Sequence, residues 1–466
     1  MEKFYCDGLK IRDTLGRERI FRGVNFCYKL PNVSWHNDLI EKAVRDIKKA
    51  GINLVRLGVT WAALEPERGK YNDELLDRLA KLIAFLGDEG IYVFFDMHQD
   101  LYSPYFHGDG APKWAVDRRH KSRHYLAIWA EGYFYMQGVQ GAFRDFWDNY
   151  SSVQDDFFRL WEHCCEKLSP LESCIGFDWF NEPYPHENGR KIFTSFLGGL
   201  AEGYTGKNKD FGKCFKGVHD RRDFVKMALS FYFSVLKTPS GFKRFMEHID
   251  DRQVIAGAVN GLEEYLESFH REKYSPFYNR LSALSGDKFS LMEHSYFSNL
   301  GVPFDIPTNA HSVYSPHAYD FFVDSPLYSK YCSIERVGFI IDKIRENQLK
   351  MNVPVIFGEW GGGVHGSKGK KHIQGILNKF EEYHWSNTYW GALDNSILKA
   401  LSTPYPTAVC GDILEMKTDY DNREFYLKYN CPEGFSKDIK TQIFIPEQGF
   451  CDYTPKSGEN VVKISY

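Results

Sequence analysis

The 466-residue sequence has no large excess of one charge and no long apolar run, and each absence excludes a class of protein. Lys and Arg total 58 against 62 Asp and Glu, giving a net charge of −4 that argues against nucleic acid as a partner. No segment approaches the roughly 18 to 20 apolar residues that span a bilayer, and residues 1–25 hold no apolar stretch of secretory length. We therefore expect a cytoplasmic protein; a secreted chain trimmed of its signal would show the same pattern.

The ten cysteines include no CxxC pair, and this argues against a structural zinc site. Cys164 and Cys165 are adjacent within a helical pattern, where a metal or disulfide framework would be awkward. We expect free thiols, no metal and no cofactor. Aromatic residues, in contrast, are abundant at 16% of the chain. Flat rings of this kind pack against sugar faces and apolar ligands as well as in protein cores.

Short β-branched and aromatic runs alternate with amphipathic stretches along the first 400 residues, a pattern typical of repeated βα units. Eight such runs predict an α/β fold, a closed (β/α)8 TIM barrel; a doubly wound open sheet is the structural alternative. The predicted strands are Arg22–Tyr28, Ile52–Leu57, Ile91–Met97, Cys174–Phe180, Gln253–Val259, Ser312–His317, Val353–Phe357 and Thr388–Leu393.

The pattern divides the chain into two units. Residues 1–400 are predicted to form the barrel, with long inserts after strands three and four, and residues 401–466 a small C-terminal β-sandwich of short alternating strands. Apolar residues after strands four and six would permit a channel for a lipid group, although packing within the inserts also explains them. They are Phe193, Phe196, Leu197, Leu200, Phe321, Phe322 and Leu327.

Two glutamates follow predicted strands, where the reactive groups of a barrel gather. Glu182 lies in Phe-Asn-Glu-Pro after strand four, and Glu359 lies in Phe-Gly-Glu-Trp after strand seven. A single such residue could be a solvated loop carboxylate or an ion-pair partner of Arg56, but two on opposed strands indicate glycoside cleavage. A separation of about 5 to 5.5 Å would give retention of configuration, and about 6.5 to 9.5 Å inversion.

These motifs carry a resemblance to a known family. The segments Trp179–Pro183 and Phe357–Trp360 resemble glycoside hydrolase family 5, with further matches at the strand ends at Arg56, His98, His317, Tyr319 and Trp390. Asp96–Ser103 and Pro404-Tyr405-Pro406 resemble its endoglycoceramidase and glucosylceramidase-like branch, which also has a C-terminal β-sandwich. One departure is that Leu401, Ser402 and Thr403 stand where that branch would have an Arg.

The resemblance implies roles for ten residues. Glu182 would be the general acid/base and Glu359 the nucleophile, supported by Tyr319 and Arg56. The implied substrate-binding residues are Lys29, His98, Asp100, Asn181, His317 and Trp390, of which Asn181 would hold the sugar 2-hydroxyl and Trp390 would form the floor beneath the sugar. Because adjacent strand residues point to opposite faces, Asn181 and Glu182 need a twist or bulge at the strand end. A metal trio of His98, Asp100 and His107 is the competing interpretation of that segment.

The sequence thus predicts a retaining β-glycosidase acting on glycosphingolipids, with possible peripheral contact with a membrane or micelle surface and no nucleic-acid partner. A steryl glucoside, another hydrophobic aglycone or a β-glucan would need the same chemistry with a different leaving group. A carbohydrate-binding barrel without catalysis is the alternative from another class.

Overall fold

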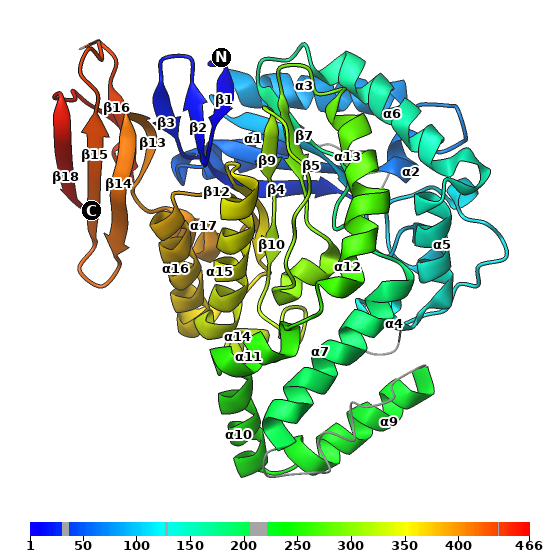
Figure 1. The fold of residues 1–466 in the computed structure, drawn as a ribbon. Coiled ribbons are helices and arrows are strands. Elements are labelled where there is room, and N and C mark those ends of the chain that lie inside the picture. The colour runs from blue at the N-terminus through cyan, green and yellow to red at the C-terminus, as the bar shows by residue number, and fades with distance from the viewer. Residues whose placement is uncertain (30–36, 126–128, 206–220, 437) are drawn as a thin grey trace.

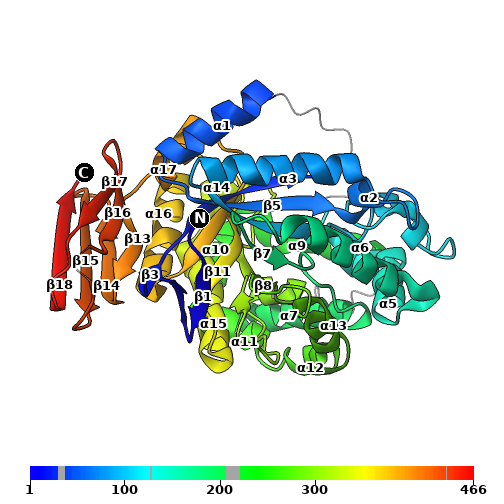
Figure 2. The same ribbon diagram turned by 90° about the horizontal axis from the view of Figure 1, so that it is seen from above.

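The computed structural model describes residues 1–466 except 30–36, 126–128, 206–220 and 437. Its centre is a curled parallel sheet that closes into the predicted eight-stranded barrel (Figures 1 and 2). In chain order the barrel strands are β4 (Arg22–Tyr28), β5 (Leu54–Thr60), β6 (Tyr92–His98), β7 (Cys174–Asp178), β8 (Phe289–Met292), β9 (Ser312–Tyr314) with β10 (His317–Ala318), β11 (Ile356–Gly361) and β12 (Ser386–Trp390).

The sixth barrel strand is divided into β9 and β10, and this division lies where the barrel closes. β9 pairs with β8, whereas β10 pairs with β11, so the two halves of one strand join the two edges of the sheet. Pro316 lies between them and has no N–H for a ladder bond. The backbone N–H of Gly358 donates to the Pro316 carbonyl at 2.9 Å, and this bond continues the pairing across the break.

The predicted fifth strand was wrong. Gln253–Val259 lies in helix α11 (Arg252–Val259), which the Asp251 side chain caps by accepting from the Gln253 N–H. A short apolar run does not distinguish a strand from a helix, and this one contains Ala256 and Ala258, which favour a helix. The true fifth strand is β8, so the insert after strand four is about forty residues longer than predicted.

Helices surround the barrel, and the two inserts add more at one end of it (Figure 1). The surrounding helices are α1 (Asn37–Lys49), α2 (Trp61–Leu64), α3 (Asp73–Asp88), α6 (Val153–Leu168), α14 (Tyr328–Tyr331), α15 (Ile334–Met351), α16 (Gly366–Tyr383) and α17 (Asn395–Leu401). The first insert holds η1 (Pro104–Phe106), η2 (Lys113–Ala115), α4 (Glu131–Tyr135), α5 (Gln137–Trp147) and η3 (Tyr150–Ser152). The second holds α7 (Glu187–Thr205), α9 (Arg221–Phe231), η4 (Tyr232–Leu236), α10 (Pro239–Ile249), α11, α12 (Glu264–Phe269), η5 (His270–Tyr274) and α13 (Ser275–Ser282); η6 (Tyr296–Leu300) follows β8.

The C-terminal strands form two antiparallel sheets that enclose their own core. They are β13 (Tyr405–Cys410), β14 (Asp412–Asp419), β15 (Glu424–Cys431), β16 (Thr441–Ile445), β17 (Gly449–Tyr453) and β18 (Gly458–Ser465). The N-terminal strands β1 (Phe4–Asp7), β2 (Lys10–Asp13) and β3 (Arg17–Arg19) complete one of these sheets, because β3 pairs with β13. The predicted division at residue 400 assigned β1, β2 and β3 to the barrel unit, whereas the structure places them in a sheet with C-terminal strands.

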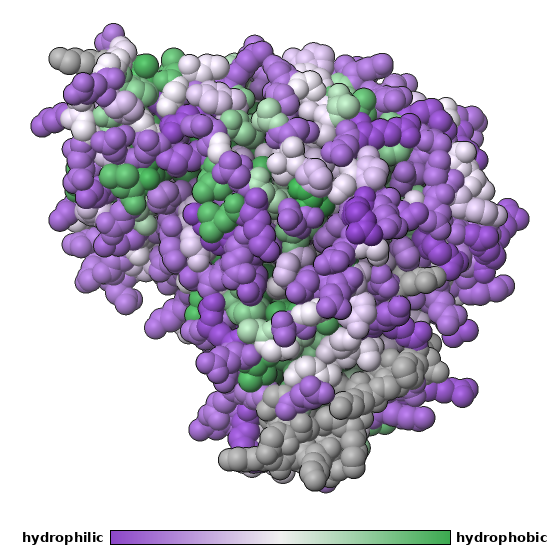
Figure 3. Space-filling view, viewed as in Figure 1, coloured by the Kyte–Doolittle hydropathy of each residue, from purple (hydrophilic) through white to green (hydrophobic). Residues whose placement is uncertain are grey.

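A buried ion pair of the barrel accepts a hydrogen bond from the C-terminal unit. Arg22 of β4 lies 3.1 Å from the carboxylate of Glu381 in α16, and Thr418 of β14 donates to the same carboxylate at 2.8 Å. Hydrophilic residues cover most of the face in Figure 3, with apolar residues in small separate groups. Within the described part of the chain, none of the helices has the length and apolar content needed to cross a bilayer.

Candidate active site

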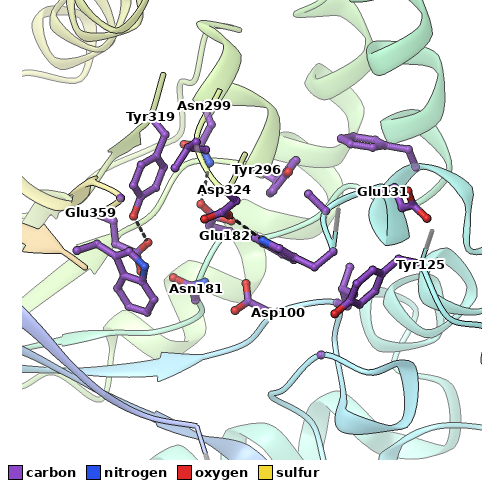
Figure 4. A pocket seen from close by; sticks show the side chains of 18 of the residues that line it. Asp100, Tyr125, Glu131, Asn181, Glu182, Tyr296, Asn299, Tyr319, Asp324 and Glu359 are labelled. Atoms are coloured by element: carbon purple, nitrogen blue, oxygen red, sulfur yellow. Dashed lines mark hydrogen bonds between the residues drawn. The ribbon is translucent and has the colours of Figure 1, made fainter. Parts of the chain in front are cut away.

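Side chains from the carboxyl ends of the barrel strands line one cavity of about 580 Å³ (Figure 4). Predicted site residues that line it are Lys29, His98, Asp100, Asn181, Glu182, Tyr319, Glu359 and Trp390. The remaining two predicted residues, Arg56 and His317, are fully buried behind these and bonded to them. All ten residues that the sequence predicted therefore lie in one connected group.

Glu182 and Glu359 face each other within this cavity. One carboxylate oxygen of each, together with a ring nitrogen of His317, forms a set whose atoms all lie within 4.8 Å of one another. Both glutamates are only 5% exposed. This separation fits the short spacing of retaining glycosidases, about 5 to 5.5 Å, in which no water needs to fit between carboxylate and sugar.

Each carboxylate oxygen of Glu359 accepts a hydrogen bond. Arg56 Nη1 lies 2.5 Å from Glu359 Oε1, and the Tyr319 hydroxyl donates to Oε2 at 2.8 Å, as the dashed line in Figure 4 shows. An ionised carboxylate with both oxygens oriented is what an attacking nucleophile requires. The predicted contacts of Tyr319 and Arg56 with Glu359 are both present.

Glu182 has surroundings that favour its protonated form. Burial raises the pKa of Glu182, and the charges of Glu359 and Asp100 act in the same direction, while a hydrogen bond from His317 opposes them. Asn299 Nδ2 donates to Glu182 Oε1 at 2.7 Å (Figure 4), and His317 Nδ1 lies 3.0 Å from the same oxygen. A carboxyl group that keeps its proton to higher pH suits a general acid.

The backbone at Glu182 adopts a left-handed conformation. Its φ is 44°, and strand β7 has already ended at Asp178, so the alternation of side chains is broken as the sequence required. The turn allows both Asn181 and Glu182 to reach the cavity. Its backbone is held by the Gln99 side chain, whose Nε2 donates to the Asn181 carbonyl at 2.9 Å.

Glu293 is a buried site residue that sequence reasoning missed. It follows β8, and its Oε2 accepts from the Glu182 backbone N–H at 2.5 Å, while its Oε1 contacts Arg56 Nη2 and lies 3.3 Å from His317 Nε2. It was missed because the fifth strand was predicted at Gln253–Val259 and not at β8. The apolar run Phe289–Met292 ending in Glu293 was the signal that would have found it.

Arg56 is surrounded by more carboxylates than its single charge can balance. Besides Glu293 and Glu359 it contacts Asp96 and Asp178, each at 3.0 Å. Burial and the nearby Glu293 raise the pKa of Asp178 well above its usual value, so Asp178 takes up a proton readily. Burial lowers the pKa of His317, but Glu293 and Glu359 outweigh it and raise that pKa well above the ordinary value.

The polar end of the cavity is built from Lys29, His98, Asp100 and Trp390. The His98 ring stacks on Trp390 at a centroid distance of 5.2 Å, and Lys29 Nζ lies 5.2 Å from the same indole centroid. Lys29 forms ion pairs with Asp100 and with Asp109, which the sequence did not single out. These donors and acceptors beside an aromatic face can bind sugar hydroxyls.

Three groups of described acidic and histidine residues have spacing that could hold a metal ion: His98, Asp100 and Asp109; Glu182, His317 and Glu359; and Asp96, Asp178 and Glu293. Lys29 pairs with acids of the first group and Arg56 with acids of the other two. The metal trio considered from sequence is not among them. His107 instead stacks on His124 at a centroid distance of 3.6 Å.

The rest of the cavity lining, which we call the apolar end, is mainly apolar but includes the acids Glu131, Asp320 and Asp324. Its apolar lining comes from the two inserts and the segments after β8 and β10, namely Trp129, Phe134, Tyr135, Phe193, Tyr296, Leu300, Phe321 and Val323. Phe134 and Phe193 stack at 3.8 Å. Of the predicted channel residues, Phe193 and Phe321 line the cavity, Phe196 packs beneath Phe321, and Leu327 is exposed. A polar reacting centre thus adjoins an apolar slot.

Comparison with family models agrees with this geometry. A model described as Cellulase (glycosyl hydrolase family 5) matches residues 15–209 and 274–396. The chain belongs to glycoside hydrolase family 5. A second family 5 model, the glycoside hydrolase family 5 C-terminal domain, matches residues 404–463. Family membership confirms the resemblance drawn from the two glutamate motifs, and with it the barrel fold and the hydrolase class.

The similar proteins include endoglycoceramidases, glucosylceramidases and an ergosteryl-beta-glucosidase of Saccharomyces cerevisiae. An endoglycoceramidase of Hydra vulgaris is 26% identical over 200 residues, covering 37% of this chain and 38% of the relative. A glucosylceramidase of Rhizopus delemar is 28% identical over 253 residues, covering 41% and 37%. The chain therefore matches about two fifths of the length of these relatives. The solved endo-glycoceramidase II from Rhodococcus sp. shares the fold with a TM-score of 0.67 at 19% identity, over 97% of this chain and 98% of that one.

Proposed function

We propose that this family 5 protein is a retaining β-glycosidase that cleaves the bond between the sugar and the lipid in glycosphingolipids. The observation that carries the proposal is the pair Glu182 and Glu359, with carboxylate oxygens within 4.8 Å, inside a cavity that is polar at one end and apolar at the other. The ceramide-linked activities named for the endoglycoceramidase and glucosylceramidase relatives support the same substrate class.

The reaction would proceed in two displacements. In the first, the Glu359 carboxylate attacks the anomeric carbon while Glu182 donates its proton to the glycosidic oxygen, so the lipid leaves as an alcohol and a glycosyl ester forms on Glu359. In the second, Glu182 accepts a proton from water as that water attacks the anomeric carbon. The ester bond breaks, the sugar leaves with its original configuration, and both glutamates return to their starting states.

The charge on Glu359 allows Glu182 to serve in both steps. While Glu359 is ionised, its negative charge contributes to the raised pKa of Glu182, and Glu182 keeps the proton that the leaving oxygen needs. When Glu359 becomes an ester, that charge is lost. The pKa of Glu182 then falls, and the carboxylate can act as a base toward water.

The two ends of the cavity would hold the two parts of the substrate. Lys29, His98 and Asp100 offer charged hydrogen-bonding groups beside the Trp390 ring, and we assign the sugar to them. Asn181 lines the cavity with its amide fixed, because Oδ1 accepts from Arg56 at 2.9 Å and Nδ2 donates to the Gln99 carbonyl at 3.0 Å. We assign the lipid to the apolar end, where removal of its chains from water contributes to binding.

The test is hydrolysis of a ceramide bearing two sugars, compared with a steryl glucoside and a soluble β-glucan under the same conditions. We expect turnover of the ceramide glycoside with the β-configured sugar as first product, and no turnover by Glu359→Gln. Release of an intact disaccharide or of one monosaccharide would show which glycosidic bond the protein cleaves. Activity confined to the glucan would overturn the lipid assignment, and an α-configured first product would overturn the retaining mechanism.

A further inference from the structure

Large apolar side chains are exposed in one short stretch of the second insert, formed by α9 and η4. Val225 is 39% exposed, Leu229 54%, Tyr232 52% and Phe233 61%. Their spacing of four, three and one residues places them along one side of a continuous helix. In Figure 1, α9 lies at the outer edge of the molecule, away from the barrel. We call these four residues the α9 apolar row.

The other side of the same helix is anchored in the protein. Met227 and Val235 are buried and form a small core with Ala201 of α7, against which Leu197 and Tyr135 pack. The α9 apolar row is therefore not the packing face of the helix. Because these four side chains remain accessible to water, they are available to an apolar phase.

The small core beneath the α9 apolar row is continuous with the active-site cavity. Tyr135 packs against that core and also lines the apolar end of the cavity. Leu197 lies one helical turn beyond Phe193, which lines the cavity as well. The route from the apolar end of the cavity to α9 therefore runs through packed side chains of α4 and α7.

The segment around the α9 apolar row is basic, although the whole chain is slightly acidic. Residues 221–247 contain six Lys and Arg against two Asp and Glu. Lys237 Nζ lies 5.7 Å from the centroid of Phe233, so this ammonium group sits beside the exposed ring. The exposed cations of the described side chains are Arg222, Lys226, Lys237, Lys243 and Arg244. Exposed apolar groups flanked by cations are typical of helices that lie in the interface of an anionic membrane.

We propose that α9 and η4 dock the protein on an anionic lipid bilayer, with the α9 apolar row inserted among the headgroups and the flanking cations on lipid phosphates. The bilayer is favoured over a protein partner because the segment combines a net positive charge with a row of exposed apolar side chains along one side of a helix. The further consequence, that docking delivers a glycolipid to the apolar end of the cavity, rests on the proposed function. Docking itself does not.

The experiment measures co-sedimentation with substrate-free vesicles of phosphatidylcholine, alone or mixed with phosphatidylserine. We expect binding to the mixed vesicles that weakens at high salt. The variant Leu229→Ser with Phe233→Ser should lose about tenfold or more in affinity, because two apolar side chains no longer enter the lipid. Leu349→Ser with Leu414→Ser is the matched control, since these leucines are 53% and 51% exposed elsewhere, and it should bind as the parent does.

Three results would overturn the docking proposal. They are an absence of vesicle binding by the parent, equal loss in the variant and its control, and a stable dimer in solution that the Leu229→Ser, Phe233→Ser variant dissociates. The last result would assign the face to a second copy of the chain. Lys226→Gln with Lys237→Gln tests the charges independently, and we expect it to reduce both the binding and its dependence on salt.

Hydrolysis separates this proposal from the proposed function. With a water-soluble aryl β-glycoside, the Leu229→Ser, Phe233→Ser variant should keep parental activity, because none of these residues lines the cavity. With a glycosyl ceramide in mixed vesicles, the same variant should lose about as much rate as it loses in binding. Vesicle binding without any ceramide hydrolysis would refute the proposed function alone, whereas ceramide hydrolysis without vesicle binding would refute docking alone.

Discussion

Glu293 accepts a hydrogen bond from the backbone N–H of Glu182, at an N···O distance of 2.5 Å. The bond fixes a left-handed backbone, and the same carboxylate contacts Arg56 and His317. One side chain thus bears on both glutamates of the proposed catalytic pair: on Glu182 through its backbone and on Glu359 through Arg56. Glu293 is a positioning residue.

Glu293→Gln keeps the shape of this side chain and removes its charge. We expect kcat to fall about 10- to 100-fold with little change in KM, because small displacements of catalytic groups cost this much. Glu293 contributes to the raised pKa of His317, so that pKa should fall in the variant. An NMR titration of the His317 ring should show this fall. An unchanged His317 titration, or a lower melting temperature that accounts for the loss of activity, would contradict the assignment.

Glu359→Gln should lower activity by several orders of magnitude without unfolding the protein. The amide cannot attack the anomeric carbon, although it keeps a hydrogen-bonding side chain of the same size beside Tyr319. A 2-deoxy-2-fluoro glycoside with a good leaving group should trap the first intermediate, and mass spectrometry of peptides should locate the label on Glu359. A label on another carboxylate would refute the nucleophile assignment.

Glu182→Gln should have an effect that depends on the leaving group. We expect severe loss with a ceramide or alkyl glycoside, whose oxygen needs a proton, and a much smaller loss in the first step with a dinitrophenyl glycoside. In the parent, activity requires protonated Glu182, and the raised pKa moves the alkaline decline above the ordinary value of about 4.3. That decline should be absent in the variant. Equal losses on both substrates would refute the acid/base role.

Phe193→Ala should discriminate between substrates by their aglycones. The Phe193 ring stacks on Phe134 at the apolar end of the cavity, so its loss removes apolar contact area from a bound lipid chain. We expect kcat/KM for a long-chain ceramide glycoside to fall about tenfold, equivalent to part of the burial energy of one Phe. For an aryl glycoside it should change less than twofold. The exposed Leu327, mutated to Ala, serves as the control.

Arg22→Met should destabilise the protein by about 3 to 5 kcal/mol, because it leaves the buried Glu381 carboxylate without its cation. Adding Glu381→Leu should recover part of that loss. Denaturant unfolding of the two variants and the parent measures the effect. If Arg22→Met and the parent unfold at the same denaturant concentration, the Arg22–Glu381 ion pair does not contribute to stability.

The barrel could be predicted because most of its strands are continuous apolar runs buried on both sides. β4, β5 and β6 lie within three residues of their predicted bounds, and polar residues stand where they end. β8 was missed because it is four residues long, while the run at Gln253–Val259 is longer but helical. Run length and periodicity distinguish strands from helices poorly when an insert contributes helices of its own.

The sequence by itself determined the family, the two proposed catalytic carboxylates and the polar residues at the strand ends, because motifs and strand periodicity are local properties. Only the tertiary structure decided the distance between Glu182 and Glu359 and the partners of each. It alone brought in Glu293 and Asn299 from the segment after β8, and it placed the N-terminal strands in the C-terminal sheet. These are contacts between residues far apart in the chain, and packing in three dimensions, not local pattern, fixes them.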